Sequence, residues 1–403
     1  MDPESQEVNR HLKALVGGKL IEGTGKAPIE DAVVIIEGDR ISNVGEADTA
    51  TVPAGAEVID VTGKTITPGL INCHTHFCLD GSPDPALALE QRSFTENVLV
   101  AAKHAEDTLR AGVTTVRDLG GWEGVDLGIK KAINDGLILG PRMLASGKLL
   151  CITGGTAHFM GREVDGPDEV RKGAREQLKA GVDCLKVMAT GGVLTAGTDP
   201  GSPQLTFEEM RAAVEEAENA GVITAAHAHG ATGIKNAVRA GVDSIEHGFF
   251  LDDEAIDLML ERGIYYVPTL APGYEITTRG TKFDIPAFMI DKARRANDAH
   301  LESFRSAQEA GVRIVAGNDG GTPFNRADNL ATELERMVAA GMSCIDSLTT
   351  AQSTAAELLR MSDQIGTVEP GKLADLLILD ADPLTDITAL RQVHMVIKAG
   401  QRI

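Results

Sequence analysis

The segment VRAGVDSIEH (residues 238–247) contains the unit from which most of this chain is built. It begins as a helix, passes through a glycine suited to the left-handed residue that ends a helix, and finishes as a short strand-like run. Four further segments repeat the unit: LRAGVTTV (109–116), LKAGVDCLKV (178–187), ENAGVITAAH (218–227) and QEAGVRIVAG (308–317). Strands that alternate with helices in this way form a parallel sheet with helices on its faces.

Short apolar runs extend the unit along the chain and predict eight strands, at 66–72, 114–117, 142–146, 184–188, 223–226, 244–246, 265–269 and 313–316. Eight strand–helix units favour an α/β fold of the (β/α)8 TIM-barrel type. An open doubly wound sheet is the alternative, but no GxGxxG motif follows a first strand to support it.

The two ends of the chain differ from its middle. Residues 1–65 and 366–403 contain several short β-like runs, and neither end is long enough to close a sheet with its own core. Together they predict a small β-sandwich domain built from both termini, beside a barrel of residues 66–365.

The composition limits the classes of partner. The 403 residues include 38 Lys and Arg against 59 Asp and Glu, and the net charge of −21 repels nucleic acid. No apolar run approaches the roughly 18 residues of a membrane span. Five scattered cysteines without CxxC spacing and a polar, acidic start without a secretory signal predict a cytoplasmic protein with reduced thiols.

The stretch ITPGLINCHTHFCLDG (66–81) places two histidines one residue apart at the end of the first predicted barrel strand. Alternate strand residues point to the same face, so His74 and His76 would lie side by side. Such a pair can hold one metal ion, or it can be a surface or structural pair. Cys73 faces the other way, and we do not expect a cysteine ligand.

Other polar residues also follow predicted strands, where TIM barrels carry their active sites. They are Lys186 in CLKVMATGG, His227 and His229 in AAHAHG, His247 in SIEHG, and Asp319 in VAGNDGG. Each taken alone has a structural alternative, such as a buried core histidine, a helix cap or an ion pair. Imidazoles and carboxylates brought together in one open barrel mouth suit Zn²⁺, with Mn²⁺, Co²⁺ or Fe²⁺ as alternatives.

The motifs TPGLINCHTH, KVMATGGV, HAHG, SIEHG and the closing GTVEPGKLADLLILD resemble the amidohydrolase superfamily. More closely, they resemble the imidazolonepropionase-related members that include Xaa-Pro dipeptidases (prolidases) and related carboxypeptidases. The resemblance covers nearly the whole chain.

The resemblance implies a binuclear metal centre. The first ion would be held by His74, His76 and Asp319, the second by His227 and His247, with Lys186 bridging both as a carbamate formed with CO₂. In such a centre a hydroxide shared by the two metals attacks the scissile carbonyl. Asp319 would take its proton and pass it to the leaving amine.

Two further histidines are assigned to the substrate through the same resemblance. His158, in TGGTAHFMG, would polarise the carbonyl, although relatives often carry their histidine where Thr156 stands here. His229 would bind the substrate, at a place where relatives often have tyrosine. The alternative for both is a histidine that orients a metal ligand. Arg117 and Asp118, which end the second barrel strand, are interpreted as a structural ion pair.

The function implied is hydrolysis of a C–N amide bond, in dipeptides of the Xaa-Pro type or in N-acyl amino acids. The alternative is a hydrolase of non-peptide amides, carbamates, ureas or cyclic amides with the same metal centre. A deaminase is less favoured because those relatives use one metal and no strand lysine. A barrel that only binds would have lost ligands, yet every ligand position is filled. We expect a small-molecule or short-peptide substrate and a homo-oligomer.

Overall fold

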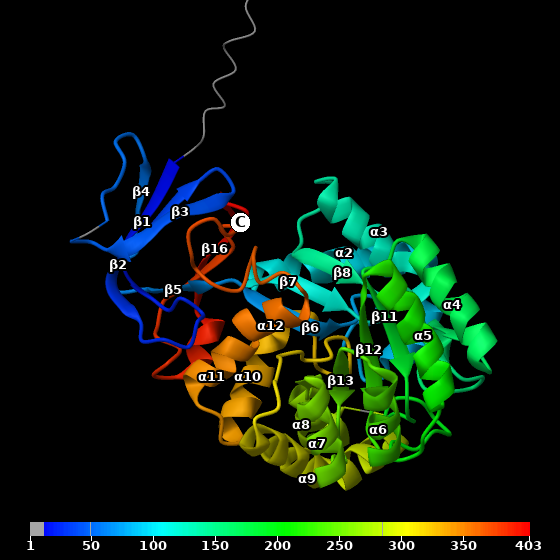
Figure 1. The fold of residues 1–403 in the computed structure, drawn as a ribbon. Coiled ribbons are helices and arrows are strands. Elements are labelled where there is room, and N and C mark those ends of the chain that lie inside the picture. Colours follow the sequence, from blue (N-terminus) through cyan, green and yellow to red (C-terminus); the bar gives the residue numbers. More distant parts are fainter. Residues whose placement is uncertain (1–11, 49, 284) are drawn as a thin grey trace, which may run out of the picture.

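A computed structural model describes residues 12–48, 50–283 and 285–403 (Figure 1). Two parallel sheets form the middle of the chain, in the orders β6-β7-β8 and β10-β9-β11-β12-β13-β14. The predicted α/β fold with parallel strands is therefore confirmed. These strands are β6 (Leu70–Thr75), β7 (Val113–Asp118), β8 (Arg142–Ala145), β9 (Leu149–Cys151), β10 (Gly161–Glu163), β11 (Cys184–Met188), β12 (Ile223–Ala228), β13 (Ser244–His247) and β14 (Tyr265–Val267).

Backbone hydrogen bonds link the edges of the two parallel sheets. The amide of Asp183 donates to the carbonyl of Ala145 at 2.9 Å, next to β8 and β11. On the other side, the amide of Tyr266 donates to Arg313 at 2.9 Å, and the amide of Cys73 donates to Ala316 at 3.0 Å. Segment 313–316 thus lies between β14 and β6.

The prediction of a full strand at 313–316 is wrong, because the segment makes only the isolated bridge between Tyr266 and Ile314. Directly after it the backbone turns at Gly317, where a Cβ would lie 2.9 Å from the His74 amide nitrogen. It then reaches Asp319, whose φ is 51°. The backbone therefore stops pairing with the neighbouring strands before it reaches Asp319.

Strands from both ends of the chain pair in a third sheet of eight strands, in the order β17-β16-β15-β5-β1-β2-β3, with β4 also pairing with β1. β5 and β15 join the two ends as antiparallel neighbours, with Ile66 opposite Ile378. Residues 1–11 of the predicted terminal domain lie outside the described residues. The strands are β1 (Leu12–Leu20), β2 (Ile29–Glu37), β3 (Arg40–Glu46), β4 (Glu57–Asp60), β5 (Thr65–Pro68), β15 (Leu376–Leu379), β16 (Val393–Lys398) and β17 (Gln401–Arg402).

Helices follow most of the parallel strands. They are α1 (Pro85–Gln91), α2 (Phe94–Arg110), α3 (Val125–Asn134), α4 (Pro167–Ala180), α5 (Phe207–Ala220), α6 (Ala231–Ala240), α7 (Asp253–Arg262), α8 (Leu270–Arg279), α9 (Ala287–Ala310), α10 (Leu330–Ala339), α11 (Cys344–Thr350) and α12 (Ser353–Leu358). Figure 1 shows α4 to α7 beside β11 to β13, and β1 to β4 gathered at the opposite side of the molecule.

The repeated glycine of the sequence unit has the predicted role. Helices α4, α5, α6, α7 and α9 each end at a glycine in the left-handed conformation, namely Gly181, Gly221, Gly241, Gly263 and Gly311. The next strand or extended segment then begins within three residues of that glycine. Within the described residues, no helix combines the length and apolar character needed to cross a membrane.

The terminal sheet is tied to the parallel strands through Leu377 of β15. Its side chain is fully buried. A Cβ on Gly112, between α2 and β7, would lie 2.7 Å from Leu377 Cδ1, so the two residues are in close contact. The leucine therefore fills space that the missing side chain of Gly112 leaves open.

We expect Leu377→Ala to lower the free energy of unfolding by about 2–5 kcal/mol, because it leaves a cavity between the sheets. Urea denaturation followed by circular dichroism measures this. Leu137→Ala, at a leucine that is 76% exposed, is the control and should change the free energy by less than about 0.5 kcal/mol. Equal effects of the two variants would contradict this packing.

Candidate metal centre

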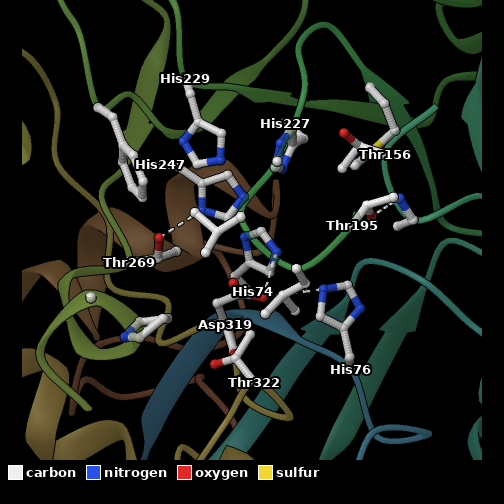
Figure 2. Close-up of a pocket in the computed structure, with 18 of the residues that line it drawn as sticks. His74, His76, Thr156, Thr195, His227, His229, His247, Thr269, Asp319 and Thr322 are labelled. Atoms are coloured by element: carbon white, nitrogen blue, oxygen red, sulfur yellow. Dashed lines mark hydrogen bonds and ion pairs between the residues drawn. The ribbon is translucent and has the colours of Figure 1, made fainter. Parts of the chain in front are cut away.

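The polar residues predicted at strand ends meet around one cavity (Figure 2). Two groups of side chains there each offer three ligand atoms within 4.8 Å of one another. The first comprises His74, His76 and Asp319, and the second comprises His227, His229 and His247. The rings of His74 and His247 connect the groups, with centroids 5.0 Å apart.

The first group is centred on the carboxylate of Asp319. Its Oδ1 lies 3.4 Å from His74 Nε2 and 3.2 Å from His76 Nε2. Burial alone would raise the pKa of Asp319, but the two histidines lower it to about 2. Three donors of this kind, with an ionised carboxylate, suit a divalent transition metal.

A buried glutamate orients His74. The Nδ1 atom of His74 donates to Glu246 Oε2 at 2.8 Å, which leaves the Nε2 lone pair facing Asp319. On its other side Glu246 accepts from Arg117 Nη2 at 2.8 Å. Burial opposes the charge, but Arg117 and His74 hold the pKa of Glu246 well below its ordinary value. A fixed carboxylate behind a histidine sets its tautomer and its direction.

The second group is a set of three adjacent imidazoles. The ring centroid of His227 lies 4.5 Å from that of His229 and 4.5 Å from that of His247. His227 Nε2 donates to the carbonyl of Gly191 at 3.2 Å, leaving its Nδ1 lone pair free. His247 Nδ1 lies 2.7 Å from Thr269 Oγ1, and a bond there leaves Nε2 as the ligand atom.

Lys186 lies close enough to both groups for its charge to lower the pKa of His74 in the first and of His227 in the second. It projects from β11 into the cavity, is fully buried, and has no hydrogen-bond partner for Nζ among the described residues. Burial lowers its pKa to about 8, although the negative charge of Glu246 opposes this. A buried, unpaired amine is costly, so the position indicates a partner or a modification at Nζ.

The imidazoles are kept unprotonated by burial. Burial and the nearby charge of Lys186 lower the pKa of His74 to about 4 and that of His227 to about 3. Burial also holds the pKa of His229 and His247 well below the ordinary value, with neighbouring histidines adding to the effect. Neutral imidazole is the form that binds metal, so these four residues are ready to act as ligands near neutral pH.

Backbone strain marks the same strand ends. His247, Thr269 and Asp319 have φ values of 74°, 53° and 51°, a region that residues with a side chain rarely occupy. Buried Glu333 supports this part of the chain, because its two carboxylate oxygens accept from the amides of Leu270 and Ala271 at the start of α8. Strain of this kind persists only where the surroundings enforce it, and it concentrates at functional sites.

The structure does not bring His158 to the cavity. Ala157 adopts φ 57° and turns the chain, so that His158 is exposed and its Nδ1 bonds to the carbonyl of Gly155 at 3.0 Å. Thr156 and Ala157 line the cavity instead. The assignment of His158 to carbonyl polarisation is therefore withdrawn. His229, in contrast, does line the cavity, and its buried Nδ1 has no partner in the described part of the chain.

The interpretation of Arg117 and Asp118 as an ion pair is wrong, because successive strand residues point to opposite faces. Arg117 pairs with Glu246 and also donates to the carbonyl of Cys73 at 2.7 Å. Asp118 instead accepts from the amide of Phe77 at 2.8 Å.

Sequence reasoning missed three supporting residues. Glu246 could have been noticed as an acidic residue inside a strand otherwise expected to be apolar. Thr269 and Glu333 gave no such signal, because a threonine after a strand and a glutamate on a helix are common. Their roles depend on side chains that meet only in three dimensions.

The sequence model of the amidohydrolase family matches residues 65–403. Ochratoxinase of Aspergillus niger is 31% identical over 409 aligned residues, covering 94% of this chain and 83% of that protein. The crystal structure of a Xaa-Pro dipeptidase with bound methionine superposes with a TM-score of 0.91 at 35% identity, covering 97% and 99% of the two chains. A structure of molinate hydrolase superposes with a TM-score of 0.84 at 27% identity, covering 98% of this chain and 95% of that chain.

We expect Glu246→Gln to weaken Zn²⁺ binding by about 10- to 100-fold, because His74 loses the carboxylate that orients it. Competition against a chelating dye measures the affinity. Glu261→Gln, at an exposed glutamate of α7, should leave the affinity unchanged. An unaltered affinity in Glu246→Gln, with the fold intact by circular dichroism, would remove Glu246 from the metal centre.

Proposed function

The chain belongs to the amidohydrolase family, acts as a hydrolase on C–N bonds, and, we propose, cleaves the amide bond of dipeptides or N-acyl amino acids with two divalent ions. The observation that carries the proposal is the meeting of two ligand groups and a buried lysine in one cavity. The Xaa-Pro dipeptidase and ochratoxinase relatives support amide substrates.

The residues present fit two metal ions, with Zn²⁺ the first choice. We assign the first ion to His74, His76 and Asp319, and the second to His227 and His247. His229 lies within ligand distance of the second site as well as lining the cavity. We keep it as the residue that contacts the substrate, since His227, His247 and a modified Lys186 already supply three donors to that ion.

The unpaired Nζ of Lys186 fits a carbamate. An unprotonated lysine amine that reacts with CO₂ forms a carbamate and releases one proton. The carbamate is an anion with two oxygens and could therefore serve as a metal ligand, whereas an ammonium would repel both ions. The pKa of about 8, lowered by burial, leaves a usable unprotonated fraction near neutral pH.

The ions would supply Lewis acidity and lower the pKa of water, so that a nucleophile forms near neutral pH. The protein's own groups do the rest. Asp319 is placed to accept the proton of the attacking water and deliver it to the leaving nitrogen. His229 contributes an imidazole on the substrate side. Apolar residues that line the cavity, such as Leu149 and Met188, would exclude bulk water and so strengthen these charge interactions.

A second candidate is hydrolysis of uncharged amides, carbamates, ureas or cyclic amides. It is favoured by the cavity lining, which includes no arginine and, among lysines, only Lys186. A free substrate carboxylate would therefore have only imidazoles and metal ions as partners. The molinate hydrolase relative fits this candidate.

We also propose that the two parallel sheets and segment 313–316 form one (β/α)8 barrel over residues 66–365. The edge hydrogen bonds from Asp183, Tyr266 and Cys73 support closure. Residues 12–48, 50–65 and 366–403 would form the second domain as a β-sandwich. The irregular pairing of β1 between Val16 and Leu20, which bends that strand, supports a folded-over sheet.

Hydrolysis of a library of dipeptides, N-acyl amino acids and neutral amides by Zn²⁺-loaded protein tests the function. We expect turnover of at least one amide class, falling by about 10³-fold or more in Asp319→Asn because proton transfer is lost. Asp257→Asn, at an exposed aspartate of α7, should retain full activity. Absence of turnover across the library, with two metals bound, would refute the amide hydrolase proposal.

Lys186→Met tests the bridging role through metal content. We expect the zinc bound per chain to fall from two ions towards one, since the shared ligand is lost while both histidine groups remain. Mass spectrometry of the intact wild-type protein should show an added 44 Da, the mass of CO₂, that is absent from the variant. Two ions retained by Lys186→Met would contradict the bridge.

A further inference from the structure

The part of the cavity beyond the metal-binding groups has a different chemical character. A row of rings leads from His247 through His229 and Phe249 to His300, with successive centroids 4.8, 3.9 and 4.2 Å apart. Figure 2 shows His229 and His247 at the start of this row, facing the first metal group.

We call this outer part the apolar chamber and define it by its walls. One part of its wall is the loop 192–195, and an adjoining part comes from α8 and α9. Val193 and Leu194 of the loop pack against a cluster on those helices that includes Ile276 and Ala293. The apolar residues that line the cavity as a whole are Leu79, Leu149, Phe159, Met160, Met188, Val193, Leu194, Phe249, Pro272, Ile276 and Ala293.

Among the described residues, no ionised side chain is found in the loop 192–195 or among the α8 and α9 residues that line the cavity. Among the residues lining the cavity, Lys186 and Asp319 carry the formal charges, and both belong to the metal-binding end. The other polar lining residues apart from histidine are neutral: Thr156, Thr195, Thr269, Asn297 and Thr322. A charged group placed in the chamber would lose its hydration and find no partner of opposite charge.

Lys292 is a buried cation whose charge is already engaged by the loop wall. It projects from α9, is 8% exposed, and donates through Nζ to the carbonyl of Gly192 at 2.9 Å and to that of Thr195 at 2.7 Å. Both acceptors belong to the loop wall. The ammonium therefore joins the loop to α9 and does not face the chamber as an anion-binding group.

The loop held by Lys292 also touches the metal-binding end. The carbonyl of Gly191 accepts from His227 Nε2 at 3.2 Å. A Cβ on Gly192 would lie 2.6 Å from Thr156 Cγ2 and 3.2 Å from His227 Nε2, so the backbone has no room to move inward. Thr195 Oγ1 accepts from the amide of Ala157 at 2.9 Å, which ties the loop to the neighbouring wall.

We propose that the apolar chamber binds an uncharged, apolar group of the substrate, and that Lys292 is a positioning residue that holds the chamber's loop wall. This rests on the proposed function only in taking the ligand to be an amide. The proposal goes beyond that function because it excludes substrates that carry a charge at the end remote from the scissile bond.

Two amides of matched shape test the chamber directly. The probes are 4-tert-butylbenzamide and 4-(trimethylammonio)benzamide, which differ by one positive charge at the remote end. Isothermal titration with Zn²⁺-loaded protein should give a Kd at least about ten-fold lower for the neutral probe, because the cation would be desolvated without a partner. The net charge of −21 favours the cation in bulk solution, so this preference would report on the chamber. Equal or tighter binding of the cation, or no binding of either probe, would overturn the proposal.

Variants of Lys292 test the positioning role. Lys292→Met keeps the aliphatic stem but removes both donors. We expect it to weaken binding of the neutral probe by about five-fold or more and to speed amide hydrogen exchange in residues 191–195, because the wall is released. Lys292→Arg should restore much of both, since a guanidinium can still donate to two carbonyls. Arg294→Met, at an exposed arginine on the same helix, is the matched control and should change neither.

The outcomes separate the inference from the proposed function. Unchanged probe affinity and unchanged exchange in Lys292→Met would overturn the positioning role. If that variant does not fold, failure of Lys292→Arg to match wild-type affinity and exchange overturns it in the same way. The neutral-probe preference of the wild type needs no turnover, so it supports the chamber even if no amide is hydrolysed. Hydrolysis of amides with a charged remote end would instead uphold the function and overturn the chamber.

Discussion

One buried carboxylate, that of Glu246, sets the arrangement of the metal centre. It accepts a hydrogen bond from His74 and pairs with Arg117, which in turn donates to the backbone of Cys73. Strands β6 and β7 of one parallel sheet and β13 of the other are therefore joined through one charge. A charge so deeply buried is tolerable only when it is fully paired. Its partners are consequently held in place, and His74 is aimed before any ion arrives.

Apolar surroundings set the protonation states of the other polar residues in the site. Burial removes the protons from the imidazoles and lowers the pKa of Lys186 to about 8, so that the ligands are in the form a metal or CO₂ needs. Apolar residues also form the chamber wall, where the Lys292 ammonium donates hydrogen bonds to two carbonyls of the loop. One physical property, low local polarity, would thus serve both the candidate metal ligands and the proposed substrate.

Motifs in the sequence predicted most of the polar residues that meet at the cavity, but not the residues that support them through long-range contacts. The histidines, Lys186 and Asp319 follow strands, and parallel strands must bring their carboxyl ends to one edge. The prediction that His158 reaches the cavity was wrong because Ala157 adopts a left-handed conformation and turns the chain there. The predicted ion pair of Arg117 with Asp118 was wrong because the true partner, Glu246, lies 129 residues away in the sequence. The supports from Thr269 and Glu333 were missed because such residues carry no distinctive local signal.

The sequence by itself determined the alternation of strands and helices, the glycines that end the helices, and the chemical identity of the candidate ligands. These follow from local conformational preference and from period-two alternation, which need no knowledge of distant residues. Only the tertiary structure decided that His229 joins His227 and His247, that Thr156 replaces His158 at the cavity, and that Lys292 faces the loop carbonyls. Each of these depends on where a side chain ends after packing, and packing is set by contacts between segments far apart in the chain.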